Sequence, residues 1–470
     1  MFFYVEKVVW KVPERRNKMD RERILELLET RQYKELKEEL EKYYPVDIAQ
    51  FLSEVEDKQM IILFRLLAKE EGAETFAYMD SDMRETLINA LTDSELEEVM
   101  DEMYLDDTVD VLEEMPANVV DRLLMVTDED TRKQINILLK YPEDSAGSVM
   151  NVDYVGLRPE MTVAEAILKI RQVGINRETI YTCYVTEKRK LIGVVDIKDL
   201  LTSSESRTME EIMDTNILYA HTTDDQEDVA SKIKKYGLVA IPIVDHERCM
   251  VGIVTVDDAM LVLQDEATED ISIMAGVAPN EESYFGTSAF QHAKNRSVWL
   301  LFLMLSATFS GLALGHFEAQ ILAMPVLNTF IPMLTGTGGN CGSQSSSLII
   351  RGLTVGEIRF KDIFRVILKE ISVALLVGSF LALVNGIRIM IMYRGQVDSP
   401  FLLALTLGLT MICTIIMAKV VGCTLPLIAD KMGLDPAIMA APLITTLVDT
   451  GTTIIYFTIA MQIFPFLKGL

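Results

Sequence analysis

Apolar residues follow different patterns along the chain, and the changes between them divide it. From residue 20 to residue 140 they recur at helical spacing, as in RERILELLETRQYKELKEELEKYY and VVDRLLMVT, which predicts amphipathic helices throughout. From residue 298 onward, five apolar runs are each long enough for the ~20 helical residues that cross a bilayer. These runs lie at 298–317, 321–346, 366–392, 400–428 and 437–464.

Between these parts, short β-branched segments alternate with helical ones, and the pattern repeats. LIGVVDIKDLL at 191–201 returns as MVGIVTVDDAML at 250–261, and SVMNV at 148–152 is echoed by EIMDT at 211–215. We expect two tandem β-α-β modules of ~60 residues each. In the helical part, VDIAQFLSEVED and VDVLEEMPANVVDRLL also resemble one another, which predicts stacked helix pairs in a superhelical domain.

The expected fold class is therefore multidomain, with a superhelical all-α domain, a tandem α/β pair, a linking helix and an α-helical transmembrane domain. We expect the linking helix to run through LQDEATEDISIMAG and onward to Lys294, Arg296 and Trp299. The expected boundaries are 1–18 for an N-terminal extension or misassigned start, 19–140 for the helical domain, 141–203 and 204–264 for the two modules, 265–297 for the linking helix region and 298–470 for five spans.

Charge follows the same division. Of the 70 acidic and 44 basic residues, only 8 and 10 lie from residue 298 onward, which leaves a net charge of -28 on residues 1–297. An acidic soluble portion followed by a nearly neutral membrane portion gives this split. The acidic surface would repel phosphate, which argues against a nucleic-acid partner. The five cysteines show no CxxC spacing, so we expect a reducing compartment and no thiolate metal site.

Orientation follows from the basic loops. The link RGLTVGEIRFKDIFR after the second run carries Arg351, Arg359, Lys361 and Arg365, so it should be cytoplasmic. With five spans, the N-terminal domains are then cytoplasmic and the C-terminus lies outside. The first residues show no secretory signal, because charges break every apolar run. In the third run we expect Glu370, with its neighbour Lys369, to snorkel or pair near the cytoplasmic interface.

The second run contains LTGTGGNCGSQSSSLII, whose glycines are spaced so that a regular helix is not expected. One interpretation is close helix packing through small residues. The other is irregular backbone beside a water-filled path, which the neighbouring Asn340, Ser343 and Gln344 favour.

The fifth run, LITTLVDTGTTIIYF at 443–457, holds one carboxylate, Asp449. An ionised aspartate near the centre of a span costs at least ~2.5–3.5 kcal/mol. Asp449 should therefore face a polar partner, a cavity or a cation rather than lipid.

A second acidic feature is DDAMLVLQDEATED, in which Glu266, Glu269 and Asp270 share one helix face, with Asp257 and Asp258 upstream. Such a cluster either forms a solvated helix face or holds hard cations through oxygen and water ligands. The spacing leaves both interpretations open.

The tandem modules resemble a pair of cystathionine β-synthase (CBS) domains, whose Gly-h-h-Thr-x-x-Asp turn matches Gly252, Thr255 and Asp258. The resemblance implies a possible ATP site at Thr255 and Asp258. The first module has Asp196 in place of the threonine, so at most one standard nucleotide site is expected. Two modules packed together without a nucleotide remain the alternative.

Over nearly the whole chain, the order of motifs resembles the MgtE family of magnesium channels and transporters. The phrases that carry this resemblance are YPEDSAGSVM at 141–150, EATED at 266–270, GTGGNCGSQSSSLIIRGL at 336–353, GLDPA at 433–437 and PLITTLVDTGTTIIYF at 442–457.

This resemblance implies a homodimer in the cell membrane, whose pore is formed by the second and fifth spans of both chains, with Asp449 facing the ion path. It also implies an intracellular Mg²⁺ sensor. The expected ion-path residues are Gly338, Gly339, Asn340, Gln344, Thr445, Thr446, Val448 and Asp449. The expected sensor carboxylates are Asp257, Asp258, Glu266, Glu269, Asp270 and Asp435.

The leading hypothesis is a Mg²⁺-selective channel that is shut by intracellular Mg²⁺. One alternative is a secondary transporter that couples a divalent cation to Na⁺ or H⁺. Another is a membrane-anchored nucleotide sensor whose spans only tether it. An enzyme is not expected, because the four histidines form no metal or triad spacing and no phosphate-binding loop or nucleophile elbow occurs.

Overall fold

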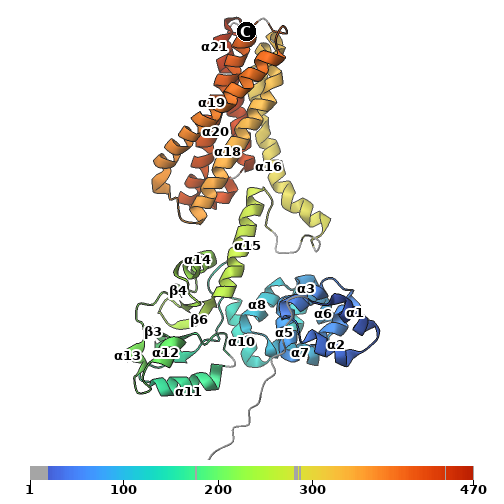
Figure 1. Cartoon of the computed structure of the whole chain (residues 1–470), viewed down its shortest axis with the longest axis vertical. Helices are drawn as coiled ribbons and strands as arrows, with labels where there is room; N and C mark the ends of the chain where they lie inside the picture. The colour runs from blue at the N-terminus through green and yellow to red at the C-terminus, as the bar shows by residue number, and fades with distance from the viewer. Residues whose placement is uncertain are drawn as a thin grey trace, which may run out of the picture. The chain divides into compact units, whose positions relative to one another are not determined.

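The computed structural model describes residues 19–174, 177–279, 284, 287–397, 399–439 and 441–468, without the side chains of residues 130 and 441 (Figure 1). The expected extension at 1–18 lies outside the described residues. The chain forms two compact units, the first ending at Asp265 and the second beginning at Glu266.

Short amphipathic helices build the front of the first unit, as predicted. Helix α1 buries Ile24, Leu27 and Leu28, which are three and four positions apart and so share one face. Thr92 begins another helix with a reciprocal capping box to Glu95. The helices are α1 (Arg21–Glu29), α2 (Tyr33–Leu40), α3 (Pro45–Leu52), α4 (Asp57–Phe64), α5 (Lys69–Ala77), α6 (Ser81–Ala90), α7 (Asp93–Glu102), α8 (Leu105–Glu114), α9 (Ala117–Val126) and α10 (Glu129–Leu138).

Two three-stranded sheets follow, which confirms the predicted repeat. In each sheet the first strand pairs parallel with the second, and the second pairs antiparallel with the third. The first module contains β1 (Gly156–Leu157), α11 (Val163–Val173), β2 (Thr182–Glu187), β3 (Lys190–Asp196) and α12 (Ile197–Thr202). Helix α13 (Met209–Ile212) also packs on the core of this module, although it lies beyond the expected boundary at residue 203. The second contains β4 (Ala220–His221), α14 (Gln226–Tyr236), β5 (Ala240–Val244), β6 (Met250–Thr255) and the start of α15 (Val256–Met274).

One hydrophobic core joins the helices of the first unit to the second sheet. Ile241, Ile243 and Val254 of that sheet belong to the same buried cluster as Val109 and Leu112 of α8. Burial of this apolar surface therefore holds the helical domain against the strand modules, which brings their acidic side chains together.

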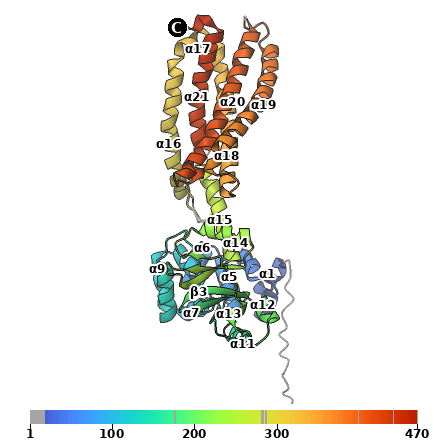
Figure 2. The same ribbon diagram turned by 90° about the vertical axis from the view of Figure 1, so that its left-hand side faces the viewer.

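The second unit is a bundle in which α18, α19, α20 and α21 lie side by side (Figures 1 and 2). Its elements are α16 (Ala289–His316), α17 (Glu318–Ala323), η2 (Pro325–Phe330), α18 (Ile331–Thr354), η3 (Phe360–Asp362), α19 (Ile363–Met392), α20 (Pro400–Lys431), η4 (Pro436–Met439), α21 (Ala441–Ile463) and η5 (Pro465–Leu467).

Among the described residues, four segments are long and apolar enough to cross a membrane. They are Ala289–His316, Phe360–Met392, Pro400–Lys431 and Pro436–Ile463. The predicted second span is not among them, because the glycines and polar residues of α18 lower its hydropathy. Four candidates are therefore found where five spans were expected.

The expectation that the glycine-rich run avoids a regular helix is wrong. Helix α18 is continuous over Ile331–Thr354, ten residues later than the predicted start of that run. Its glycines lie where neighbouring helices approach. A Cβ on Gly422 of α20 would lie 2.3 Å from the carbonyl oxygen of Gly342. Small residues thus allow backbone-to-backbone packing, while the helix satisfies its own amides and carbonyls.

The linking helix also ends earlier than expected. Helix α15 stops at Met274, and Gly276 takes a left-handed φ of +72° that a side chain would strain. A Cβ there would lie 2.2 Å from Cδ1 of Trp299, so the indole packs on this turn. The amide of Ala278 donates to the carbonyl of Asn295, 3.1 Å away. Lys294, Arg296 and Trp299 belong to α16, a separate helix capped by Ser288.

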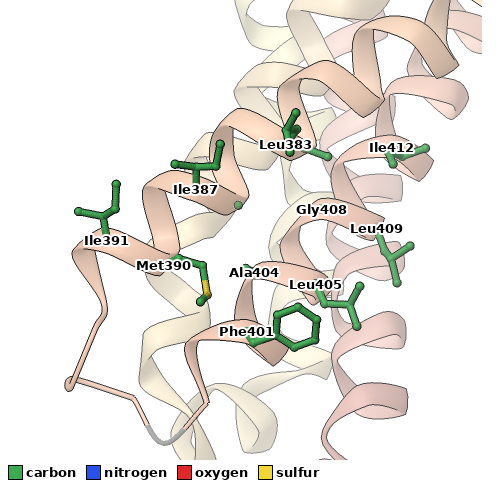
Figure 3. Close-up of a pocket in the computed structure, with 12 residues that line it drawn as sticks. Leu383, Ile387, Met390, Ile391, Phe401, Ala404, Leu405, Gly408, Leu409 and Ile412 are labelled. Carbon is green, nitrogen blue, oxygen red and sulfur yellow. The ribbon is translucent and has the colours of Figure 1, made fainter.

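A groove of about 560 Å³ opens between α19 and α20 (Figure 3). It exists because small residues, Ala382 and Gly386 on one helix and Ala404 and Gly408 on the other, leave space between larger apolar side chains. The lining offers almost no polar surface. A groove of this kind suits hydrocarbon and provides no ligand for an ion, so the functional site is elsewhere.

Candidate functional site

Asp449 is the one charged residue in the sequence of helix α21. The nearby threonine hydroxyls do not bind its carboxylate. Thr445 and Thr446 donate to the carbonyl of Pro442 at 2.8 and 3.2 Å, and Thr453 donates to the carbonyl of Asp449 at 2.9 Å. Asp449 itself is partly exposed, so its carboxylate is available to a ligand from outside this chain.

The glycines of α18 pack directly on α21. A Cβ on Gly338 would lie 2.7 Å from Cγ1 of Val448, and one on Gly339 would lie 2.9 Å from Cγ2 of Thr445. The hydroxyls of Thr414 and Thr452 beside Gly338 are buried and have no hydrogen-bond partner among the described residues. These contacts place the predicted residues of the second and fifth runs on adjoining helices.

Asn340 and Gln344 lie on the opposite side of α18 from its packed face. They are four positions apart and both exposed, whereas Cys341 and Ser345 next to them are buried. In the part of the chain that the structure describes, neither amide hydrogen-bonds Asp449. The structure therefore brings Gly338 and Gly339 to α21, and leaves Asn340 and Gln344 on an open polar stripe.

The first unit contains an acidic cluster that sequence reasoning missed, formed by Asp106, Asp107 and Asp110 on α8 with Glu178 and Asp258. The side-chain amide of Asn151 donates to Asp106 at 3.0 Å and to Glu178 at 3.1 Å. One oxygen of Asp106, Oδ1, is buried without a partner. Because these residues come from the helical domain and both strand modules, the cluster lies where the three meet.

Lost hydration is the largest cause that raises the pKa of each carboxyl in this cluster, although Asp110 lies at its exposed edge, and the charges of neighbouring acids come next. The pKa of Asp106 rises to about 7 and that of Asp107 to about 6. The pKa values of Asp110 and Glu178 both rise to about 8, and that of Asp258 is also raised. The group therefore resists carrying its full negative charge.

A second, smaller acidic group lies in the second unit. Burial raises the pKa of Asp270, and the negative charges of Asp435 and Glu266 raise it further. Asp435 also accepts a hydrogen bond from the amide of Ala437 at 2.7 Å. Glu269 lies on the same helix, α15. The six predicted sensor carboxylates are thus divided, with Asp257 and Asp258 in the first unit and the others in the second.

Neither acidic group provides a complete set of ligands for a metal ion. Across the described ranges, no three His, Cys, Asp or Glu side chains converge closely enough to hold one metal ion. Oxygen ligands, negative charge and the unpartnered Asp106 oxygen nevertheless fit a hydrated hard cation, which is bound largely through its own waters.

The nucleotide motif shares one residue with the acidic cluster. The hydroxyl and the amide of Thr255 both donate to Asp258 Oδ2, the amide at 3.3 Å. In the first module Asp196 takes the threonine's place and accepts a hydrogen bond from Thr182 at 2.9 Å. The corresponding turns of the two modules therefore make different hydrogen bonds.

The missed acids had a signal in the sequence. YLDDTVDVLEE carries aspartates at positions i, i+1 and i+4, two of which share a helix face. Glu178 had no such signal, because the acids that act on it lie about 70 residues before it and about 80 residues after it in the chain. Burial and distant partners, which decide its charge state, cannot be inferred from spacing.

Comparison with known protein families identifies the chain's relatives. The model of MgtE, described as a divalent cation transporter, matches residues 331–459. The MgtE intracellular N domain matches 43–144, and CBS domains match 146–206 and 209–265. Over 430 residues the chain is 34% identical to the magnesium transporter MgtE of Thermus thermophilus, covering 90% of this chain and 94% of that protein. The chain belongs to the MgtE family.

Other relatives agree with this assignment. The magnesium transporter MgtE of Bacillus subtilis is 31% identical, covering 93% of this chain and 96% of its own. A crystal structure of the cytosolic domain of the Mg²⁺ channel MgtE in complex with ATP matches with 33% identity and a TM-score of 0.50, covering 52% of this chain and 99% of that one. Together with the apolar helices, family membership confirms a multi-pass membrane protein with a CBS pair.

The acidic cluster of the first unit predicts that the thermal stability of the protein depends on pH. A carboxyl whose pKa is raised by folding favours the protonated form, so its destabilising effect is full above the folded pKa and is relieved as pH falls. We expect the melting temperature of the Mg²⁺-free protein to rise as pH falls from about 8 towards about 5. We also expect millimolar Mg²⁺ to raise it more at pH 8 than at pH 6.

Scanning calorimetry of the full chain in detergent, with and without chelator, checks this. Asp106→Asn combined with Asp110→Asn should flatten the pH dependence, whereas Asp101→Asn, an exposed acid on α7, should leave it unchanged. A wild-type protein whose Mg²⁺-free stability falls over the same pH interval contradicts the assignment.

Proposed function

We propose that the protein is a Mg²⁺-selective channel that mediates magnesium uptake and is shut by intracellular Mg²⁺. The observation that carries this proposal is the position of Asp449. A carboxylate in an apolar helix, beside a glycine-packed helix of an MgtE family member, needs a cationic partner. The relatives named magnesium transporters support Mg²⁺ as that cation.

The proposed pore lies between two copies of the chain. Asn340 and Gln344 form an exposed polar stripe on α18, and Asp449 is partly exposed on the adjoining α21. Polar side chains on a membrane helix are costly against lipid, so a second copy that covers this face explains them. In this homodimer α18 also crosses the membrane, which brings the number of spans in each protomer to five, since a helix that lines a hydrated path need not be strongly apolar.

Two Asp449 carboxylates that face one another on a dimer axis would repel, and a divalent cation between them offsets that repulsion. Mg²⁺ releases its water reluctantly, so the ion remains hydrated and is held through water. The backbone carbonyl oxygens of Thr445, Thr446 and Val448 also help to hold the hydrated ion. Each carbonyl has a second lone pair that the helix hydrogen bond does not use. Weak, water-mediated contact also lets the ion leave, as conduction requires.

The proposed gate responds to cytoplasmic Mg²⁺ at both acidic groups. When ions are scarce, repulsion among carboxylates favours separated arrangements, and cations that fill the groups favour the closed one. The cation must bind the closed state more tightly for this to work. Asp270, Glu266 and Asp435 form the group in the second unit, with Glu269 on the same helix.

In the first unit, Asp257 and Asp258 join the α8 acids to form the other proposed sensor group. The loop with Arg351, Arg359, Lys361 and Arg365 supports a cytoplasmic position for these sensors and an outside position for the C-terminus. The membrane is then the cell membrane, where the sensor measures the internal pool of the transported ion.

A secondary transporter coupled to Na⁺ or H⁺ is the alternative that the carboxylates favour. Asp449 can serve as a coupling site as well as a filter, because both roles need an ionised group in the span. Dependence of uptake on a Na⁺ or pH gradient distinguishes this transporter from a channel.

Asp449→Asn should reduce Mg²⁺ current by at least about tenfold, the factor that accompanies a loss of ~1.4 kcal/mol of stabilisation. The amide keeps the size of the side chain and removes the charge that attracts the cation. Currents through the purified protein in a patched bilayer provide the measurement. Glu357→Gln, at an exposed loop acid, is the control and should conduct normally. Unchanged current in Asp449→Asn contradicts the proposed pore.

The sensor group of α15 can be tested separately by replacing Glu266, Glu269 and Asp270 with Gln, Gln and Asn. We expect the current to persist and to need at least about tenfold more cytoplasmic Mg²⁺ for inhibition, because the closed state loses its bound cations. The matched control removes three exposed carboxylates of the first module, Glu160, Glu187 and Glu210, and should be inhibited normally. Normal inhibition of the α15 variant refutes this sensor.

We also propose that ATP binds at the turn of the second module, supported by the ATP complex of the related cytosolic domain. Thr255→Ala should weaken ATP binding at least about tenfold, because it removes a hydroxyl that orients Asp258. Calorimetric titration of the full chain provides the measurement. Thr202→Ala on α12 serves as the control, and equal ATP affinity in both variants rejects the site.

A further inference from the structure

Three helices of the second unit meet at a buried ion pair. Nζ of Lys419 on α20 lies 3.2 Å from Oε2 of Glu370 on α19. Ser345 on α18 connects to both, because its hydroxyl donates to the same Glu370 oxygen at 2.6 Å and accepts from Lys419 at 3.0 Å. The lysine and glutamate side chains are only 6% and 12% exposed. The three residues form a closed polar triangle.

The expectation that Glu370 pairs is met, but its partner is a residue that the sequence did not single out. Lys419 lies within Pro400–Lys431, a candidate span. A buried ion pair of this kind costs much of its own attraction in lost hydration, and apolar residues of similar volume often fit as well or better. Stability alone therefore gives no reason for two charges here.

The glycine contacts of α18 lack the directional bonds that the triangle has. Gly342 meets Gly422 of α20, while Gly338 and Gly339 meet Val448 and Thr445 of α21. These are small, smooth surfaces without directional bonds, and such surfaces allow one helix to slide or rotate against another. A charged triangle is directional, since each hydrogen bond has a required distance and angle.

The next residue on α18 extends this arrangement to the start of α21. Ser346 is buried and donates to the carbonyl of Met439 at 3.2 Å. Met439 ends η4, the short helix that precedes α21. Two adjacent serines thus fix α18 to α19 and α20 on one side, and to the entrance of α21 on the other.

We propose that Glu370 and Lys419 are positioning residues for ion transport. They hold Ser345, and through it α18, at the one register that sets Gly338 and Gly339 against the helix that carries Asp449. This inference rests on the proposed transport function, and adds residues outside the ion path to it. The ion pair thus keeps α18 in the position that transport requires, and the stability of the bundle does not depend on it.

The decisive variant replaces both charges by uncharged groups of similar size, Glu370→Gln with Lys419→Met. We expect it to fold, with a melting temperature and elution volume close to those of the wild type. Its maximal Mg²⁺ flux into proteoliposomes should fall about tenfold, while the Mg²⁺ concentration at half-maximal flux stays nearly unchanged, because Asp449 is intact. The exchanged pair, Glu370→Lys with Lys419→Glu, should recover most of the flux.

Two matched controls define the effect. Lys369→Met removes the exposed lysine next to Glu370, and Ser372→Ala removes an exposed α19 hydroxyl that bonds only its own helix. Both should transport like the wild type. Ser345→Ala leaves the ion pair in place and removes its link to α18, so its flux should fall severalfold even though no charge has changed.

The outcomes separate the two proposals. A folded double variant with wild-type flux overturns the positioning role. If the double variant does not fold, Ser345→Ala decides, and wild-type flux there overturns the role as well. Absence of Mg²⁺ flux in the wild type and both controls would instead overturn the proposed function.

Discussion

Carboxylates that lie close together and away from water repel one another, and the arrangement of this protein depends on how that repulsion is relieved. Asp106 and Glu178 are half-buried where three domains meet, and Asp110 lies at the exposed edge of the same cluster. Their pKa values rise because the ionised forms are disfavoured. Protons or cations must compensate the charge if the domains are to stay in contact. A hydrophobic core under the same contact holds the parts near enough for this to matter.

In the helix bundle the constraint is different, because hydrocarbon cannot solvate polar groups. Helix α18 accommodates its glycines, serines and threonine hydroxyls by packing them on other helices and bonding them to backbone carbonyls. Lys419 and Glu370 compensate each other's charge. Asp449 is different, because among the described residues no cation pairs with it, whereas Glu370 has Lys419.

Much of this organisation was predictable from the sequence. Period and repetition predicted α1–α10 and the paired sheets, since those patterns arise from local geometry. The position of Asp449 within an apolar helix was predictable, because a lone charge in an apolar run is conspicuous; its role in ion transport remains a proposal. The helix over Ile331–Thr354 was not, because glycine lowers helix propensity and only the approach of Gly422 explains why glycine is needed there. Glu178 and Lys419 depend on partners far along the chain, which spacing does not reveal.

The turn after α15 has a mechanical consequence. Gly276 packs on the indole of Trp299, and Ala278 bonds the backbone of Asn295, so the end of α15 is fastened to the beginning of α16. Further along α16, the hydroxyl of Ser310 lies 2.7 Å from that of Thr450, the residue next to Asp449. Helix α16 therefore connects the end of α15 to the helix that carries Asp449. A displacement of α16 at Trp299 would reach Thr450 through one continuous helix, with no flexible segment between the two contacts.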